Sequence, residues 1–197
     1  MADAPHLGGW LEFDGNSWTP WLWSFLIDTF KPVTALDVGC GRGHAARFFL
    51  DLGVDAYGID GSAEARKMAS IPQDRFFLHD FTTGPAPMLW PVDRFDLVWS
   101  CEFVEHVEES FVDNVLDILS RGKVVAMTHA TPGQDGWHHV NCQPRDYWVD
   151  KMNSIGYQLD VEATTRSHAY PPEIVAQDVL ERSWWGRSGM IFARRTT

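Results

Sequence analysis

The feature that most constrains the fold is the regular alternation of short apolar segments with segments of helical spacing. The short runs are rich in Val, Ile, Phe and Trp and are bounded by Gly, Pro or acidic residues. Such alternation is typical of a mostly parallel sheet with helices on both faces. We expect strands within 33–39, 55–60, 75–80, 95–100, 123–129, 157–165 and 189–195, and helices within 20–30, 44–53, 62–70, 102–122, 144–156 and 171–183.

Composition narrows the range of partners. Of 197 residues, 16 are Lys or Arg and 27 are Asp or Glu, which gives a formal net charge of −11. An acidic surface repels phosphate groups, so we expect neither nucleic acid nor a membrane as a partner. The three Cys residues form no CxxC pair, and the first residues do not resemble a signal peptide. We therefore expect a cytoplasmic protein, with one domain over 1–197.

A glycine-rich turn, "ALDVGCGRGHAA", follows the first predicted strand. Its spacing of Gly39, Gly41 and Gly43 places His44 where a dinucleotide-binding turn has its last glycine. The Gly-Lys-Ser/Thr ending of a nucleotide triphosphate loop is absent from this turn. Asp37, just before the turn, would repel a pyrophosphate and attract an ammonium group. The turn therefore favours a ligand with an amino acid end.

The next two predicted strands end in acids that suit the rest of such a ligand. Asp60 ends the second strand, where a carboxylate can accept hydrogen bonds from a ribose diol. Asp80 ends the third strand and can accept from an exocyclic amine, while Phe81 can stack on a purine. Together with Asp37, these residues describe a ligand with an amino acid end, a ribose and an adenine.

The segments "ALDVGCGRG", "GID", "HDF" and "FDLVWSCEFVEHV" resemble, in order, the motifs of class I S-adenosylmethionine-dependent methyltransferases. The resemblance implies a doubly wound α/β fold, with a seven-stranded sheet of order 3-2-1-4-5-7-6 and strand 7 antiparallel. It implies a Rossmann-like core over 33–197 and a helical cap or lid over 1–30. The cofactor, S-adenosylmethionine, would contact Asp37, Gly39, Cys40, Gly41, Asp60, Gly61, Asp80, Phe81, Ser100 and Cys101.

Histidines near the ends of the fourth and fifth strands are candidate bases. Ligands of doubly wound sheets bind at the carboxyl ends of the strands, and a histidine can take a proton from a hydroxyl at neutral pH. By position along the chain, His106 and His129 rank first, followed by His139. These three residues are the predicted catalytic residues.

Glu102, Glu105 and His106 form an E-x-x-E-H stretch within the predicted helix 102–122, where their spacing would place them on one face. The stretch resembles that of ubiquinone-pathway and small-RNA O-methyltransferases, where it is associated with a divalent metal. Acidic residues in a first helical turn also stabilise the helix dipole without any metal. The predicted site therefore includes no assigned metal ligand, and a divalent ion at these three residues is an alternative.

The predicted function is methyl transfer from S-adenosylmethionine to a small-molecule acceptor, with oxygen as the expected acceptor atom. A catalytically silent cofactor-binding subunit and a nicotinamide-dependent oxidoreductase are the alternatives.

Overall fold

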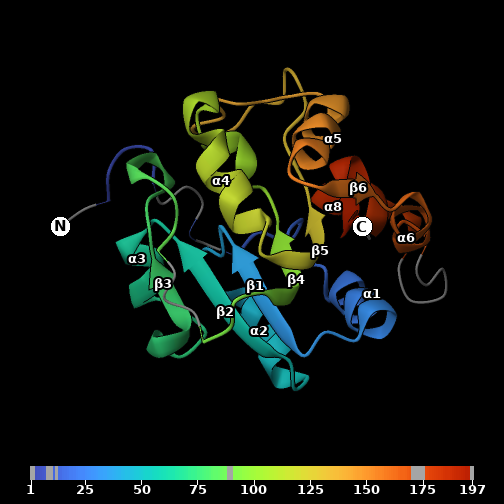
Figure 1. Cartoon of the computed structure of the whole chain (residues 1–197), viewed down its shortest axis with the longest axis horizontal. Helices are drawn as coiled ribbons and strands as arrows, with labels where there is room; N and C mark the ends of the chain where they lie inside the picture. The colour runs from blue at the N-terminus through green and yellow to red at the C-terminus, as the bar shows by residue number, and fades with distance from the viewer. Residues whose placement is uncertain (1–2, 8–10, 12, 88–90, 170–175, 196–197) are drawn as a thin grey trace.

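A computed structural model describes residues 3–7, 11, 13–87, 91–169 and 176–195. Within these residues the chain forms a seven-stranded sheet of order β3-β2-β1-β4-β5-β7-β6 (Figure 1). The strands pair in parallel except that β7 runs antiparallel to both β5 and β6. This confirms the predicted fold class. The strands are β1 (Thr34–Val38), β2 (Asp55–Asp60), β3 (Phe76–Leu78), β4 (Phe95–Ser100), β5 (Gly122–Met127), β6 (Tyr157–Leu159) and β7 (Met190–Arg194).

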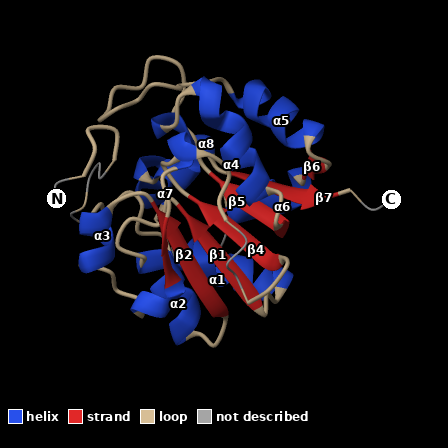
Figure 2. Cartoon of the chain, turned by 60° about the vertical axis from the view of Figure 1, so that its left-hand side comes forward, coloured by secondary structure: helices blue, strands red, loops and turns tan. Residues whose placement is uncertain are grey.

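Helices cover both faces of the sheet (Figure 2). One face packs against α4 and α5, and the other against α1, α2, α3, α6 and α8. The α-helices are α1 (Pro20–Phe30), α2 (His44–Asp51), α3 (Ala63–Lys67), α4 (Val112–Leu119), α5 (Arg145–Ser154), α6 (Val161–Ser167), α7 (Gln177–Arg182) and α8 (Trp184–Ser188). Four short 3-10 helices are η1 (Gln73–Arg75), η2 (Phe81–Thr83), η3 (Val104–His106) and η4 (Glu109–Phe111).

The tryptophans contribute much of the core beneath α1 and α8. Trp99 of β4 is fully buried and stacks on Trp185 of α8, with ring centroids 5.7 Å apart. The edge of Trp23 from α1 meets the same Trp99 ring at 6.3 Å. Pro20 occupies the first helical position, as predicted, and α1 buries Leu22 in this core. The helix of the N-terminal segment is thus part of the packed core.

The segment 102–122, predicted to be helical, forms regular α-helix only in its later part, as α4. Glu102 has a left-handed backbone (φ 49°), and only the short turns η3 and η4 precede α4. The carbonyl oxygen of Glu105 accepts hydrogen bonds from the backbone N–H groups of Val140 and Asn141, both at 3.0 Å. Because this carbonyl is engaged by a distant loop, it is not used for helix continuation, and regular helix begins only at Val112.

The predicted strand 157–165 is too long. It ends at Leu159, because the Asp160 side chain accepts a hydrogen bond from the Ala163 N–H (2.8 Å) and caps α6. The first residues of the predicted helix 171–183 lie outside the described part of the chain. Its later residues form α7. The short helix α8 was not predicted. Among the described residues, no helix has the length and apolar character needed to cross a membrane.

Candidate active site

The glycine turn after β1 needs glycine for two reasons. Gly39, Gly41 and Gly43 all have positive φ, which side-chain-bearing residues rarely adopt. At Gly39, a Cβ would also lie 2.3 Å from the Phe103 ring. The backbone N–H groups of Gly39 and Cys40 both donate to the Ile59 carbonyl, which fixes the turn against the end of β2. The turn therefore lies at the carboxyl end of the sheet, held by backbone hydrogen bonds and packed closely against Phe103.

Asp37 lies beneath this turn and is almost completely buried. Among the described residues, its carboxylate accepts one hydrogen bond, from the Ala46 N–H of α2 at 3.2 Å. Burial raises the pKa of Asp37 to about 7, and the nearby Asp60 charge adds to the shift. A ligand with a positive charge would relieve this unfavourable burial of a carboxylate.

Asp60 ends β2 as predicted, whereas β3 ends at Leu78 and Asp80 follows it as the cap of η2. Both carboxylates are engaged in local hydrogen bonds. Asp60 accepts from the backbone N–H groups of Gly41 and Ser62, both at 2.8 Å, so it holds the glycine turn to the start of α3. Asp80 caps η2 by accepting from the Thr82 N–H (2.9 Å). Each ionised carboxylate has lone pairs left for a ligand after these bonds.

Two adjoining cavities open above these residues. The smaller, of about 150 Å³, is lined by the glycine turn and by Asp60, Gly61, Asp80 and Phe81. The larger, of about 510 Å³, also reaches the glycine turn and contains Asp37, Cys40 and Cys101. Gly39, Gly41, Glu102 and His106 line both cavities. A single elongated ligand could therefore extend from one cavity into the other.

The larger cavity is aromatic and acidic. Its acidic lining residues are Asp14, Asp37, Glu102 and Asp135, while Arg42 is the one Lys or Arg among the described residues that line it. Trp137 is 58% exposed and Trp18 is 40% exposed, so part of the aromatic lining faces solvent. The aromatic lining residues are Phe13, Trp18, Trp23, Trp99, Trp137 and Trp184.

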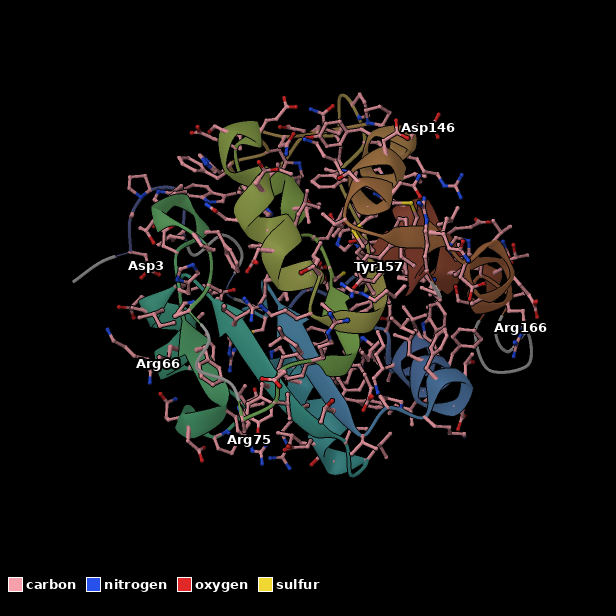
Figure 3. The ribbon with its side chains drawn as sticks, viewed as in Figure 1. Asp3, Arg66, Arg75, Asp146, Tyr157 and Arg166 are labelled. Carbon is pink, nitrogen blue, oxygen red and sulfur yellow. The ribbon has the colours of Figure 1, made fainter. Side chains whose placement is uncertain are left out.

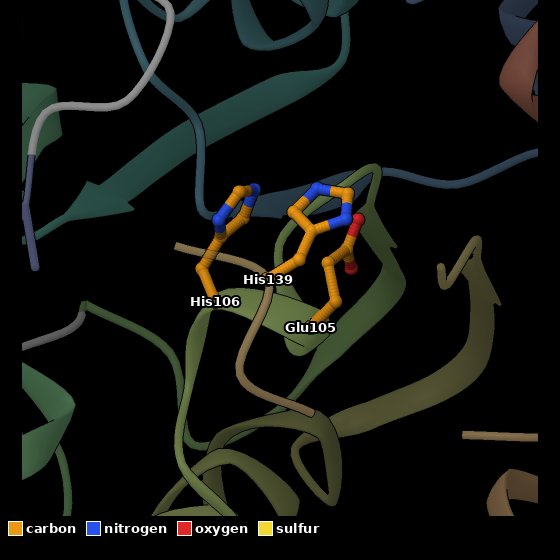
Figure 4. Close-up of side chains that lie close together, drawn as sticks. All are labelled: Glu105, His106 and His139. Carbon is orange, nitrogen blue, oxygen red and sulfur yellow. The ribbon is translucent and has the colours of Figure 1, made fainter. Parts of the chain in front are cut away.

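Glu105, His106 and His139 come together (Figure 4), and the two histidines line the larger cavity. One ligand atom of each lies within 4.8 Å of the others, and the two imidazole rings are 5.0 Å apart. Glu105 and His106 come from η3, whereas His139 comes from the loop after β5. The carboxylate oxygens of Glu105 are buried and have no hydrogen-bond partner among the described residues. An orphaned buried carboxylate beside two imidazoles suits a divalent metal ion.

Glu102 lies next to this cluster and is held by the loop after β5. Thr128 donates from its Oγ1 to Glu102 Oε1 (2.9 Å), and the Gln134 side-chain amide donates to Glu102 Oε2 (3.3 Å). The Gln134 carbonyl oxygen also lies 3.2 Å from Nδ1 of His139. Thr128 and Gln134 were not predicted, because no motif links them to Glu102 in the sequence.

The electrostatics of the cluster follow from its burial. Burial raises the pKa of Glu105 well above its usual range, and the nearby Glu102 charge raises it further. Burial lowers the pKa of His106 to about 4, so this imidazole is neutral at physiological pH. A neutral imidazole has a free nitrogen lone pair, which can bind a cation.

Two predicted site residues lie elsewhere. His129 is buried and lines neither cavity; its ring packs near Trp148, 6.5 Å away between centroids. Ser100 is likewise buried and absent from both linings. Cys101, one residue after Ser100, lines the larger cavity. Thr128, one residue before His129, donates a hydrogen bond to Glu102. The structure thus separates His129 from the other two candidate bases.

Comparison with known proteins places this geometry in a family. A family model described as a methyltransferase domain matches residues 13–173. The chain is 29% identical over 139 residues to a probable chloroplastic tocopherol O-methyltransferase of Oryza sativa, covering 64% of this chain and 35% of the relative. It is 35% identical over 84 residues to a ubiquinone biosynthesis O-methyltransferase of Rhodopseudomonas palustris, covering 42% of this chain and 33% of the relative. The chain thus spans about a third of the length of these curated relatives.

A solved structure supports the fold independently. The TehB-like SAM-dependent methyltransferase of Corynebacterium glutamicum superposes with a TM-score of 0.60 at 18% identity, and 88% of each chain is covered. At this sequence identity, the structural similarity supports a shared fold.

Proposed function

Because the chain belongs to the class I S-adenosylmethionine-dependent methyltransferases, we propose that it methylates a hydroxyl group of a small aromatic acceptor. The observation that carries this proposal is the pair of adjoining cavities. One has the acids expected for a nucleoside, and the other is lined by aromatic rings and meets a carboxylate–histidine cluster.

The cofactor residues keep their predicted roles in this proposal. Asp37 would pair with the ammonium group of the methionine end, Asp60 with the ribose hydroxyls, and Asp80 and Phe81 with the adenine. Gly39, Cys40, Gly41, Gly61 and Cys101 line the same cavities and would contact the cofactor through backbone or close packing. S-adenosylmethionine supplies a methyl group on a sulfonium, which is already activated for in-line displacement. The protein therefore contributes mainly positioning.

The acceptor hydroxyl must lose a proton, and the cluster provides the groups for this step. We place it beside His106 and His139, since both line the larger cavity. Glu105, His106 and His139, with Glu102 beside them, would hold a divalent metal ion, which would acidify the hydroxyl. Two nitrogen and two oxygen ligands suit a first-row transition ion such as Mn²⁺, Fe²⁺ or Zn²⁺.

Two observations support an aromatic hydroxyl acceptor. The aromatic side chains of the larger cavity can stack on a flat ring. The two relatives named above are called tocopherol and ubiquinone O-methyltransferases, and both names point to methylation at oxygen. The acidic lining disfavours a carboxylate or phosphate on the acceptor, because like charges brought together cost several kcal/mol.

The test is a two-stage assay on the purified protein. Equilibrium binding of S-adenosylhomocysteine is measured first, and methyl transfer from labelled S-adenosylmethionine to a panel of small phenols and catechols follows, with added Mn²⁺. Turnover should be at least about tenfold faster for a neutral catechol than for its carboxylate-bearing analogue. Binding without transfer to any hydroxyl acceptor would identify a silent binding subunit, and no binding would overturn the proposal.

A further inference from the structure

The described N-terminal residues 3–7 cross the mouth of the smaller cavity. They run past the start of α3 and the end of β3, and Figure 1 shows the N-terminal trace on that side of the molecule. Three side chains fix them there: Asp3, His6 and Leu7. We call residues 3–7 the N-terminal strap.

Asp3 anchors one end of the strap on α3. Its carboxylate accepts hydrogen bonds from the Ser62 Oγ (2.5 Å) and the Ala63 N–H (2.9 Å). Figure 3 shows Asp3 at the edge of the molecule on the side of α3. The Leu7 N–H donates to the Ala4 carbonyl (2.9 Å), so the strap turns back on itself and directs its last two side chains toward the cavity.

His6 and Leu7 contact the residues proposed to bind the adenosine half of the cofactor. His6 Nε2 lies 3.0 Å from Asp80 Oδ2, the oxygen that does not bond to Thr82. Leu7 packs so closely on Gly61 that a Cβ there would be 2.5 Å from Leu7 Cδ2. Both strap residues also line the smaller cavity.

The strap narrows the space beside Asp80 and Gly61. The smaller cavity measures about 150 Å³ with the strap as one of its walls. An adenosine half that used Asp80 and lay against Gly61 would meet His6 and Leu7 at the same groups.

We propose that the N-terminal strap competes with the adenosine half of the cofactor, with His6 occupying the acceptor oxygen of Asp80 and Leu7 covering Gly61. This inference rests on the proposed function, which assigns Asp60, Asp80 and Phe81 to the cofactor. The strap lowers cofactor affinity by the free energy of its own contacts. It also gives the protein a segment whose position reports whether the site is occupied.

The test compares the full chain with the variants His6→Ala and Leu7→Ala. Leu52→Ala is the matched control, because Leu52 is a leucine that is 54% exposed beyond α2 and lines neither cavity. Affinities for S-adenosylhomocysteine and for adenosine alone are measured by calorimetry. Loss of a contact of this kind, about 1 kcal/mol, should tighten both ligands by roughly fivefold in each strap variant, with no change in the control.

Hydrogen exchange of the strap amides distinguishes two cases: the cofactor displaces the strap, or the strap closes over the bound cofactor. Saturating S-adenosylhomocysteine should speed exchange of the Leu7 amide, because a displaced strap loses the contacts with Asp80 and Gly61 that hold its turn in place. Slower exchange, together with weaker binding by the strap variants, would show that the strap closes over the cofactor and would overturn competition. Unchanged affinity in both variants would also overturn it. Failure of every variant and of the native chain to bind S-adenosylhomocysteine would instead overturn the cofactor site itself.

Discussion

At the scale of single residues, the buried Asp37 carboxylate destabilises the unliganded fold, and we expect it to strengthen cofactor binding. The carboxylate is buried with one backbone donor, and its raised pKa records that the ionised form is disfavoured there. Asp37→Asn keeps an oxygen that can accept from the Ala46 N–H but removes the charge. We expect the thermal midpoint without ligand to rise by at least about 2 °C, corresponding to roughly 1 kcal/mol in a chain of this size.

The same substitution should weaken binding of S-adenosylhomocysteine by at least about tenfold, since the proposed partner of the ammonium group is lost. Calorimetry and thermal unfolding of the same samples provide both values. Asp51→Asn, an exposed acid at the end of α2, is the control and should leave affinity unchanged. Equal affinity of the Asp37 variant and the native chain would remove Asp37 from the cofactor site.

Glu105 permits a separate test of the metal. Both of its oxygens are buried without a described hydrogen-bond partner, so a ligand role predicts that Glu105→Gln weakens Mn²⁺ binding at least about tenfold. Electron paramagnetic resonance of free Mn²⁺ measures this directly, without any turnover. Glu108→Gln, three residues further along and exposed, is the control. Identical Mn²⁺ titrations for the two variants would show that the cluster is not a metal site.

At the scale of elements, the turn between β1 and α2 depends on glycine for close packing as well as for its backbone angles. Gly39 and Gly53 both have positive φ, but a Cβ on Gly53 would meet no atom within 4 Å, whereas one on Gly39 would collide with Phe103. Gly53→Ala should cost about 1–2 kcal/mol of unfolding free energy through backbone strain alone.

Gly39→Ala adds overpacking of roughly 1–3 kcal/mol to the same strain. It should also move the turn, and so weaken S-adenosylhomocysteine binding, which Gly53→Ala should not. Urea unfolding and calorimetry measure the two effects. If both variants lost the same unfolding free energy and kept native affinity for S-adenosylhomocysteine, the close packing of Gly39 on Phe103 would not be needed for cofactor binding.

The sequence predicted best those site residues that lie where strands end. Asp37, Asp60 and Asp80 could be placed because the carboxyl ends of parallel strands meet at one edge of the sheet. His129 could not, because neighbouring residues of an extended segment point to opposite sides. Thr128 bonds to Glu102, while the ring of His129 packs near Trp148. Two neighbouring residues of this segment therefore have side chains in different places, one at the site and the other in the interior.

At the scale of the whole molecule, the larger cavity is assembled from segments that lie far apart in the chain. Asp14 accepts a hydrogen bond from Trp184 Nε1 (2.7 Å), which joins residues 170 positions apart. The loop after β5 supplies Gln134 and His139 to the same cavity. These contacts depend on tertiary packing rather than on local pattern. The sequence consequently predicted the cofactor motifs but neither the shape nor the aromatic lining of the acceptor site.

Cofactor binding should also stabilise the whole fold in a pH-dependent way. The raised pKa of Asp37, about 7 against an ordinary 3.8, means that the folded chain without ligand binds more protons than the unfolded chain between these values. Stability contributed by this group is therefore lost as pH rises from about 4 to about 7. Pairing with an ammonium group favours the ionised carboxylate, so binding should release a proton and tighten as pH rises toward 8.

The thermal shift produced by S-adenosylhomocysteine measures this coupling. Ligand at about 100 times its Kd adds about 2.7 kcal/mol, which corresponds to roughly 5–11 °C in a chain of this size. At a fixed ligand concentration, the shift should be larger at pH 7.5 than at pH 5.5. Asp37→Asn should show a smaller shift with little dependence on pH, which separates this carboxylate from the other titrating groups. A shift in the native chain that is equal at both pH values would rule out the ionisation of Asp37 as a source of binding free energy.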